Sequence, residues 1–145
     1  MTTSRSDPER VVRIVAAVLL DEAGRTLLVR KRGTEAFMQP GGKKDEGETS
    51  LAALTREIEE ELGLTIAAER FAPVGTFRAP AANEPGWTVE AELFSARADG
   101  PIHIAAEIEE AIWVEPGISE GLVLAPLTRQ FAIPVAARMA GGGAG

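Results

Sequence analysis

Residues 42–64 read GKKDEGETSLAALTREIEEELGL, and this stretch decides the predicted fold. A glycine-rich loop opens it, and a segment of helical periodicity follows, with apolar positions at Leu51, Leu54, Ile58 and Leu62. Thr49 or Ser50 can cap this helix, and Gly63 can end it. We therefore expect a well-defined helix that follows directly on a flexible loop.

Three carboxylates on this helix share one face. Glu57, Glu60 and Glu61 stand at positions i, i+3 and i+4, which places them within an arc of roughly 100°. Like charges at this spacing destabilise a helix by about 0.2–0.5 kcal/mol per pair, and a divalent cation would relieve that repulsion. Backbone carbonyls of Gly41 and Gly42 can complete the oxygen-rich shell that Mg²⁺ accepts. The alternative is a solvated acidic helix face.

The composition limits the chemistry that is open to the chain. The sequence has 145 residues, 45% of them hydrophobic, which fits one ordinary domain. It contains no cysteine, so thiol nucleophiles and thiolate zinc sites are excluded, and the single His103 cannot build a multi-histidine site. The 22 acidic residues can supply a hard-cation site for Mg²⁺ or Mn²⁺. The net charge of −7 argues against binding to a nucleic acid polymer.

The ends of the chain suggest neither a signal peptide nor a membrane anchor. The N-terminus, MTTSRSDPER, has no apolar region, and no apolar run reaches the roughly 20 residues that a bilayer crossing needs. We expect a cytoplasmic protein without a membrane partner. Residues 1–9 are expected to be flexible, as is the glycine-rich tail at 141–145.

The remaining chain predicts several strands and one more helix. The β-branched run at 11–20 is typical of a strand buried on both faces, and residues 26–29 would form a hairpin with it. Further extended segments are expected at 37–38, 72–77, 88–96 and 111–114. A final helix at 127–139 should be interrupted or kinked at Pro134.

The loop and helix together resemble the Nudix box in every defined position. The positions that carry the resemblance are Gly42, Glu48, Arg56, Glu57, Ile58, Glu60, Glu61, Gly63 and Leu64. The approach Phe37-Met38-Gln39-Pro40-Gly41-Gly42 and the order of strands are also similar to that family. The resemblance implies an α/β fold, an α/β/α sandwich around a mixed β-sheet, with a Nudix hydrolase domain over residues 10–140.

The resemblance also implies roles for individual residues. Glu57, Glu60 and Glu61 would ligate Mg²⁺, or Mn²⁺ in its place, with the carbonyl of Gly41 as a further ligand. Arg56 and Glu48 would orient them, since a planar guanidinium fork can hold a carboxylate in position. Glu107 or Glu110, in the acidic stretch before a late strand, would add a ligand or a base. A metal-activated water would attack a diphosphate linkage, with Glu57, Glu60 or Glu107 as proton acceptor.

Residues outside the box are expected to select the substrate. We expect Arg30 and Arg32 to meet phosphate charge, because alternation along a strand sends Lys31 to the opposite side. Candidates for stacking on a base are Phe37, Phe77 and Trp87, and candidates for hydrogen bonds to it are Asn83 and Glu84 in the loop APAANEPG. Each aromatic residue has a core position as its alternative.

The resemblance leaves the substrate open. The short chain and the approach FMQPGGK look like the MutT-type (d)NTP pyrophosphohydrolases, which act on nucleoside-diphosphate compounds including oxidised nucleotides. Pro80, 16 positions after Leu64, instead favours an ADP-ribose or nucleotide-sugar pyrophosphatase. A nucleotide-sensing module without turnover is the alternative of another class, and the protein could be a monomer or a homodimer.

Overall fold

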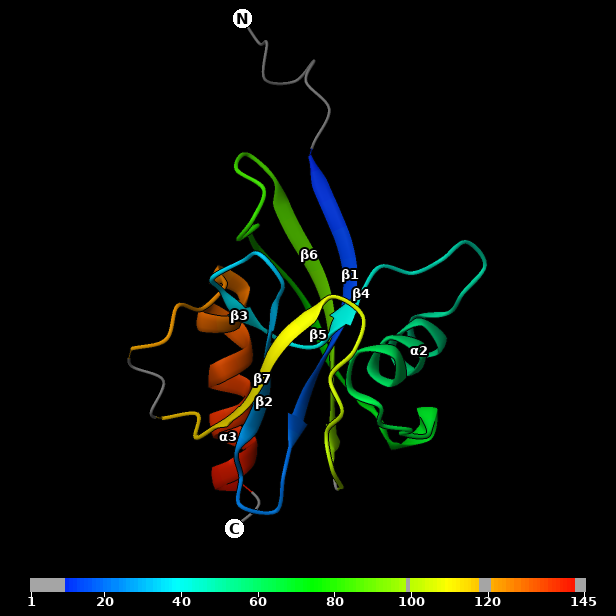
Figure 1. The fold of residues 1–145 in the computed structure, drawn as a ribbon, viewed down its shortest axis with the longest axis vertical. Coiled ribbons are helices and arrows are strands. Elements are labelled where there is room, and N and C mark those ends of the chain that lie inside the picture. The colour runs from blue at the N-terminus through cyan, green and yellow to red at the C-terminus, as the bar shows by residue number, and fades with distance from the viewer. Residues whose placement is uncertain (1–9, 99, 118–120, 143–145) are drawn as a thin grey trace, which may run out of the picture.

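The structure is a computed structural model that describes residues 10–98, 100–117 and 121–142. It is a three-layer arrangement in which helices α2 (Ser50–Leu62) and α3 (Ile133–Gly142) lie on opposite sides of a β-sheet (Figure 1). Residues 1–9 and 143–145, where flexible ends were predicted, lie outside the described residues, and α3 extends two residues into the predicted tail. Within the described ranges, no helix is long and apolar enough to cross a membrane.

Strand β1 (Val11–Leu20) lies at the centre of the sheet, and its alternating side chains explain the three layers. Val15, Ala17 and Leu19 pack into the core cluster beneath α2, together with Leu54 and Ile58. The intervening Ala16, Val18 and Leu20 pack into a second cluster, which contains Val135 and Ala136 of α3. A strand buried on both faces needs the continuous apolar run seen at this position in the sequence. The predicted α/β sandwich is confirmed.

The sheet is mixed because β1 has partners of both directions. It pairs in parallel along its whole length with β6 (Thr88–Arg97), and antiparallel with two short stretches of chain. One of these is the start of β2 (Thr26–Lys31), and the other is β4 (Gly41–Gly42). The sheet is completed by β5 (Ala72–Pro80) on β6, and by β3 (Phe37–Met38) and β7 (Ile108–Val114) on β2.

Helix α2 has the ends that its sequence predicts. The hydroxyl of Thr49 accepts a hydrogen bond from the backbone N–H of Ala52, and Gly63 ends the helix with φ +70°. Its buried face carries Ala53, Leu54, Ile58 and Leu62, and also the carboxylate residue Glu61. The register of this helix therefore places one acid of the predicted metal cluster inside the protein.

The C-terminal helix was expected to be interrupted or kinked at Pro134, and it has a π-helical turn just before that residue. A π-helical turn, Thr128–Ala132, precedes α3, and the N–H of Ile133 donates to the carbonyl of Thr128. Pro134 has no N–H to continue the regular helical pattern, and one wide turn accommodates that loss without interrupting the helix. A short 3₁₀ helix, Ala68–Arg70, was also not predicted.

The two glycines of β4 allow three elements to approach closely. A Cβ on Gly41, which has φ +154°, would lie 2.7 Å from the Cα of Ala16 and still closer to the carbonyl of Val15. A Cβ on Gly42 would lie 2.5 Å from the carboxylate carbon of Glu57. A side chain at position 41 would meet backbone atoms of β1, and one at position 42 would displace the Glu57 carboxylate, so the glycines let β4 lie close to both β1 and the acidic face of α2.

We expect Gly41→Ala to lower the free energy of unfolding by at least about 2 kcal/mol, because the new methyl group meets backbone atoms that cannot move aside. Gly117→Ala is the matched control, since nothing lies within 4 Å of a Cβ there, and it should change stability by less than about 0.5 kcal/mol. Urea unfolding in the presence of EDTA measures both. Equal stability of the two variants would show that β4 does not constrain β1.

Candidate active site

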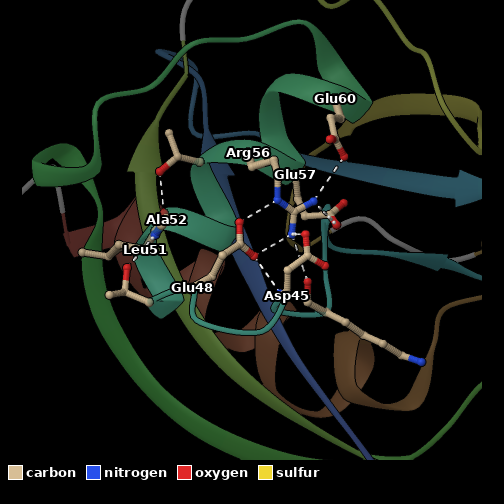
Figure 2. A network of polar contacts seen from close by, with 10 residues as sticks. Asp45, Glu48, Leu51, Ala52, Arg56, Glu57 and Glu60 are labelled. Atoms are coloured by element: carbon tan, nitrogen blue, oxygen red, sulfur yellow. Dashed lines mark hydrogen bonds and ion pairs between the residues drawn. The ribbon is translucent and has the colours of Figure 1, made fainter.

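Arg56 is the centre of a polar network at the loop side of α2 (Figure 2). Its Nε and Nη2 both donate to the carboxylate of Glu48 at 2.8 Å, which is a bidentate pair. Its Nη1 lies 3.1 Å from Glu57 and 3.3 Å from Glu60, and Nη2 also donates to the carbonyl of Lys43. The Arg56 hydrogen bond lowers the pKa of Glu48 to about 2. The Arg56 guanidinium thus links Lys43 and Glu48 of the loop to Glu57 and Glu60 of α2.

Glu57 lies half-buried between Arg56 and Gly42. Burial raises the pKa of this carboxyl, although the hydrogen bond from Arg56 acts in the opposite direction. The nearby charge of Glu60 raises the pKa further, and that of Lys31 lowers it. Glu57 is therefore a carboxylate whose negative charge is only partly compensated by its surroundings.

Glu61 is the most deeply buried of the acids in the box, with 5% of its surface exposed. It accepts one hydrogen bond, from the backbone N–H of Gly41 at 3.2 Å, and it enters none of the ion pairs found among the described residues. Burial, and then the charge of Glu57, raise the pKa of Glu61 to about 8. A buried carboxylate beside another, with no cationic partner, fits the oxygen donor set of a divalent cation.

The side chains are not gathered into a closed metal cluster. Across the part of the chain that the structure describes, no three acidic or histidine side chains converge as a ready-made cation site. Glu60 is turned towards Arg56 (Figure 2), whereas Glu61 accepts its hydrogen bond from Gly41. The donors that could hold a cation, Glu57, Glu60 and Glu61, are thus on adjacent turns of one helix, and Arg56 balances the first two.

A cleft of about 490 Å³ begins beside this acidic helix face. Its charged end is lined by Lys31, Lys43, Glu57 and Glu107, and the Nζ of Lys31 lies 3.7 Å from a carboxylate oxygen of Glu107. Its other side is largely apolar, with three residues of β1 on the α3 face of the sheet and the side chains of Val89 and Leu127. The remaining lining comes from Met38, Gln39, Gly42, the loop residues Pro80, Ala81, Ala82, Asn83 and Glu84, and Ala125 and Thr128. An apolar slot with one charged end suits a small ligand that carries both a ring and an anionic group.

Only some of the residues expected to bind substrate line this cleft. Asn83 and Glu84 do, whereas Arg30 and Arg32 do not. Alternation along β2 holds: Lys31 follows Leu27 and Val29 on the face beneath α2 and lines the cleft. Arg30 lies on the opposite face with Leu28 and Phe37. The prediction assigned the wrong face of the strand to the substrate. Arg30 instead pairs with Glu110 at 3.1 Å, so of the two acids proposed before β7 only Glu107 lines the cleft.

The three aromatic candidates lie elsewhere. Phe37 is buried in a core cluster, with the guanidinium of Arg30 6.0 Å from its ring centre. Phe77 stacks on Phe131, with 4.8 Å between ring centres. Trp87 is 36% exposed at the end of the β5–β6 loop and is not among the lining residues. Stacking on a base by these rings stays a prediction from the sequence.

Sequence reasoning missed four polar residues of the cleft. Lys31 was set aside by strand alternation, and Lys43 stands at a variable position of the box. Gln39 had a signal, since it directly precedes Pro40 and the glycine pair. Thr128 had none, because it reaches the cleft from a helix that follows 89 residues after Gln39.

Comparison with known proteins gives the family. A family model described as the NUDIX domain matches residues 10–129, which is most of the chain, and the chain belongs to this family. It is 37% identical over 60 residues to an 8-oxo-dGTP diphosphatase of Haemophilus influenzae, covering 39% of this chain and 44% of that protein. It is 32% identical over 102 residues to a Bacillus subtilis protein provisionally named 8-oxo-dGTP diphosphatase, covering 69% of this chain and 64% of that one.

A solved structure covers more of the chain. The crystal structure of a MutT NUDIX hydrolase from Burkholderia pseudomallei is 25% identical, with a TM-score of 0.67 over 91% of this chain and 98% of that chain. The chain spans less than two thirds of the length of both curated relatives. The predicted membership of the MutT-like Nudix family is confirmed.

The raised pKa of Glu61 predicts a pH-dependent stability. Between the ordinary value of 4.5 and about 8, the folded protein binds this proton more tightly than the unfolded chain, so stability should fall as pH rises through that window. We expect Tm in EDTA to decrease from about pH 5 to pH 8, and Mg²⁺ to reduce the decrease. Glu61→Gln should flatten the profile, and a variant with the wild-type profile would remove Glu61 as its cause.

Proposed function

We propose that the chain is a Mg²⁺-dependent pyrophosphohydrolase that cleaves the diphosphate linkage of a nucleoside triphosphate, most closely in the manner of MutT-type enzymes. The observation that carries this proposal is the buried Glu61, which has no cationic partner among the described residues and lies beside Glu57 at the charged end of the cleft. Such a pair is unfavourable alone and favourable around a dication. Family membership supports the same reaction.

The three acids of the box would hold the cation, together with the backbone of Gly41. When bound, Mg²⁺ would polarise the phosphate oxygens and lower the pKa of the attacking water. Arg56 and Glu48 would keep the loop and the acids in register, because a bidentate pair restrains both partners. In this proposal Arg56 and Glu48 are positioning residues that do not touch the substrate.

Lys31 and Lys43 would receive the negative charge of the phosphates, since both line the charged end of the cleft. The same end presents two carboxylates, Glu57 and Glu107, and one of them would accept the proton of the water. Glu60 is the weaker candidate because its carboxylate is turned towards Arg56. Glu57→Gln and Glu107→Gln, compared over a pH profile of kcat, would identify the acceptor.

An oxidised purine nucleotide is the proposed substrate. Both curated relatives carry the name 8-oxo-dGTP diphosphatase. A second candidate is an ADP-ribose or nucleotide-sugar pyrophosphatase, favoured by Pro80, which stands at the end of β5 and lines the cleft. Location in the cytoplasm, and action as a monomer or homodimer, stay predictions from the sequence.

The test is phosphate and pyrophosphate release over a panel of dGTP, 8-oxo-dGTP, the other dNTPs, ADP-ribose and UDP-glucose. We expect turnover of nucleoside triphosphates in Mg²⁺ or Mn²⁺, and none in EDTA. Turnover of ADP-ribose alone would replace the first candidate with the second. Tight binding of a nucleotide, by isothermal titration, with no turnover of any compound would instead identify a sensing module.

The acidic helix provides matched variants for the metal site. We expect Glu57→Gln and Glu61→Gln to lower kcat at least about a hundredfold, since a neutral amide keeps the shape of the side chain but loses the charge of a ligand. Glu59→Gln is the control, because this neighbouring acid is exposed and bonds only to Thr65 in the described network. Equal rates for Glu61→Gln and Glu59→Gln would exclude Glu61 from the metal site.

A further inference from the structure

Gln39 has a buried hydrogen-bond donor with no partner. Its side chain is 6% exposed, and its Oε1 accepts a hydrogen bond from the hydroxyl of Thr128 at 2.8 Å. Its Nε2 is buried without any hydrogen-bond partner. Buried polar atoms are paired in the great majority of cases, so an unpaired amide at this position needs a cause.

The position of Gln39 supplies that cause. Gln39 and Thr128 both line the cleft that carries Lys31 and Glu57 at its charged end. The one other side-chain atom of this kind in the described part of the chain is the Thr26 hydroxyl, which is fully buried in β2 and away from the cleft lining. The unpaired donor of Gln39 thus belongs to a residue that lines the cleft, whereas that of Thr26 does not.

Contacts on both sides of Gln39 hold this residue at the cleft. The carbonyl of Pro40 accepts a hydrogen bond from the N–H of Ala17 at 3.0 Å, which ties the backbone after Gln39 to β1. Thr128 begins the π-helical turn, a local feature that often occurs at functional sites. Because its hydroxyl donates to Oε1, the amide oxygen is occupied and the amide nitrogen is left for the ligand.

The surroundings of Gln39 suit a flat heterocycle. Ile14, Val89 and Leu127 give that part of the cleft apolar walls, and Gln39 provides a directed polar group among them. A ring bound there would face the unpaired Nε2 donor of Gln39, since the Oε1 acceptor is already bonded to Thr128. The complementary partner of such a donor is a ring carbonyl oxygen, not a ring amino group.

We propose that Gln39 determines base specificity by donating a hydrogen bond from Nε2 to a carbonyl oxygen of the base. If the carbonyl is the one at purine C6 or pyrimidine C4, the cleft would favour guanine, 8-oxoguanine and uracil, which have an oxo group there, over the amino bases adenine and cytosine, which have an amino group at that position. The inference rests on the proposed function for its reaction, and it deepens that function by assigning the recognition of the base. An amino base would leave the donor unpaired and bring a second donor against it.

The first experiment compares kcat/KM for dGTP with dATP, and for dUTP with dCTP. We expect the oxo member of each pair to be preferred by roughly tenfold or more, the size of one good hydrogen bond. Gln39→Met, which keeps the length of the side chain and removes its polar atoms, should abolish the preference mainly through KM. Gln130→Met is the matched control, because Gln130 is exposed in the π-helical turn that begins at Thr128. This variant should keep the preference for the oxo member of each pair.

A stability measurement separates recognition from a structural role. Gln39→Met removes an unpaired buried donor together with the acceptor of the Thr128 hydroxyl, so its Tm in the absence of nucleotide should fall only by the equivalent of about one lost buried hydrogen bond. A preference that survives in Gln39→Met, a preference for the amino bases, or equal use of dGTP and dATP by the wild type would each overturn the inference. A large fall in Tm accompanied by an unchanged preference would assign Gln39 to the core.

Binding without turnover distinguishes this inference from the proposed function. Isothermal titration with dGMP and dAMP in EDTA should show tighter binding of dGMP, and Gln39→Met should remove the difference. If no compound is hydrolysed but this difference is found, the proposed function fails and the role of Gln39 stands. If nucleotides are hydrolysed but dGMP and dAMP bind equally, the role of Gln39 fails and the proposed function stands.

Discussion

The site depends on one constraint, the close packing of β4. This strand contacts β1 on one side and the acidic face of α2 on the other. Gly41 has backbone atoms of β1 where a Cβ would be, and Gly42 has the carboxylate of Glu57 there. The same approach brings the N–H of Gly41 to Glu61, which is otherwise buried without a cationic partner among the described residues. Any larger residue in β4 would separate the loop from the helix, and with it the charged end of the cleft from the acids.

The sequence predicts the fold well because the fold depends on local patterns. A continuous apolar run predicts the central strand β1, and the spacing of Leu54, Ile58 and Leu62 predicts α2 together with its cap and its terminal glycine. The pairing of β1 with β6 in parallel is beyond such reasoning, since it joins residues far apart in the chain. The π-helical turn before Pro134 was also beyond it, because a proline in a helical segment predicts a disturbance without specifying its form.

The candidate site could likewise be predicted only where it depends on local spacing along the chain. The acids of the box lie on one helix, so their spacing alone predicts that they are neighbours, and it cannot predict that Glu61 is buried while Glu60 is exposed. Strand alternation places Arg30 and Lys31 on opposite faces correctly, but it cannot predict which face borders the cleft, because that depends on how the sheet packs against α2. The contact of Gln39 with Thr128 requires the folded chain, since neither residue alone suggests it.

The segment from Met38 to Lys43 shows how this architecture can change its ligand over evolutionary time. Its backbone is held by Pro40 and by two glycines in close contact with β1 and Glu57, whereas the side chain of Gln39 lines the cleft and bonds to Thr128, outside the sheet. In the proposed scheme, a substitution at that one position would alter which ring the cleft accepts and leave unchanged the acids of α2 that are proposed to hold the cation. The residue proposed to read the base and the acids proposed to hold the cation thus belong to different elements, which would let selectivity and chemistry diverge independently.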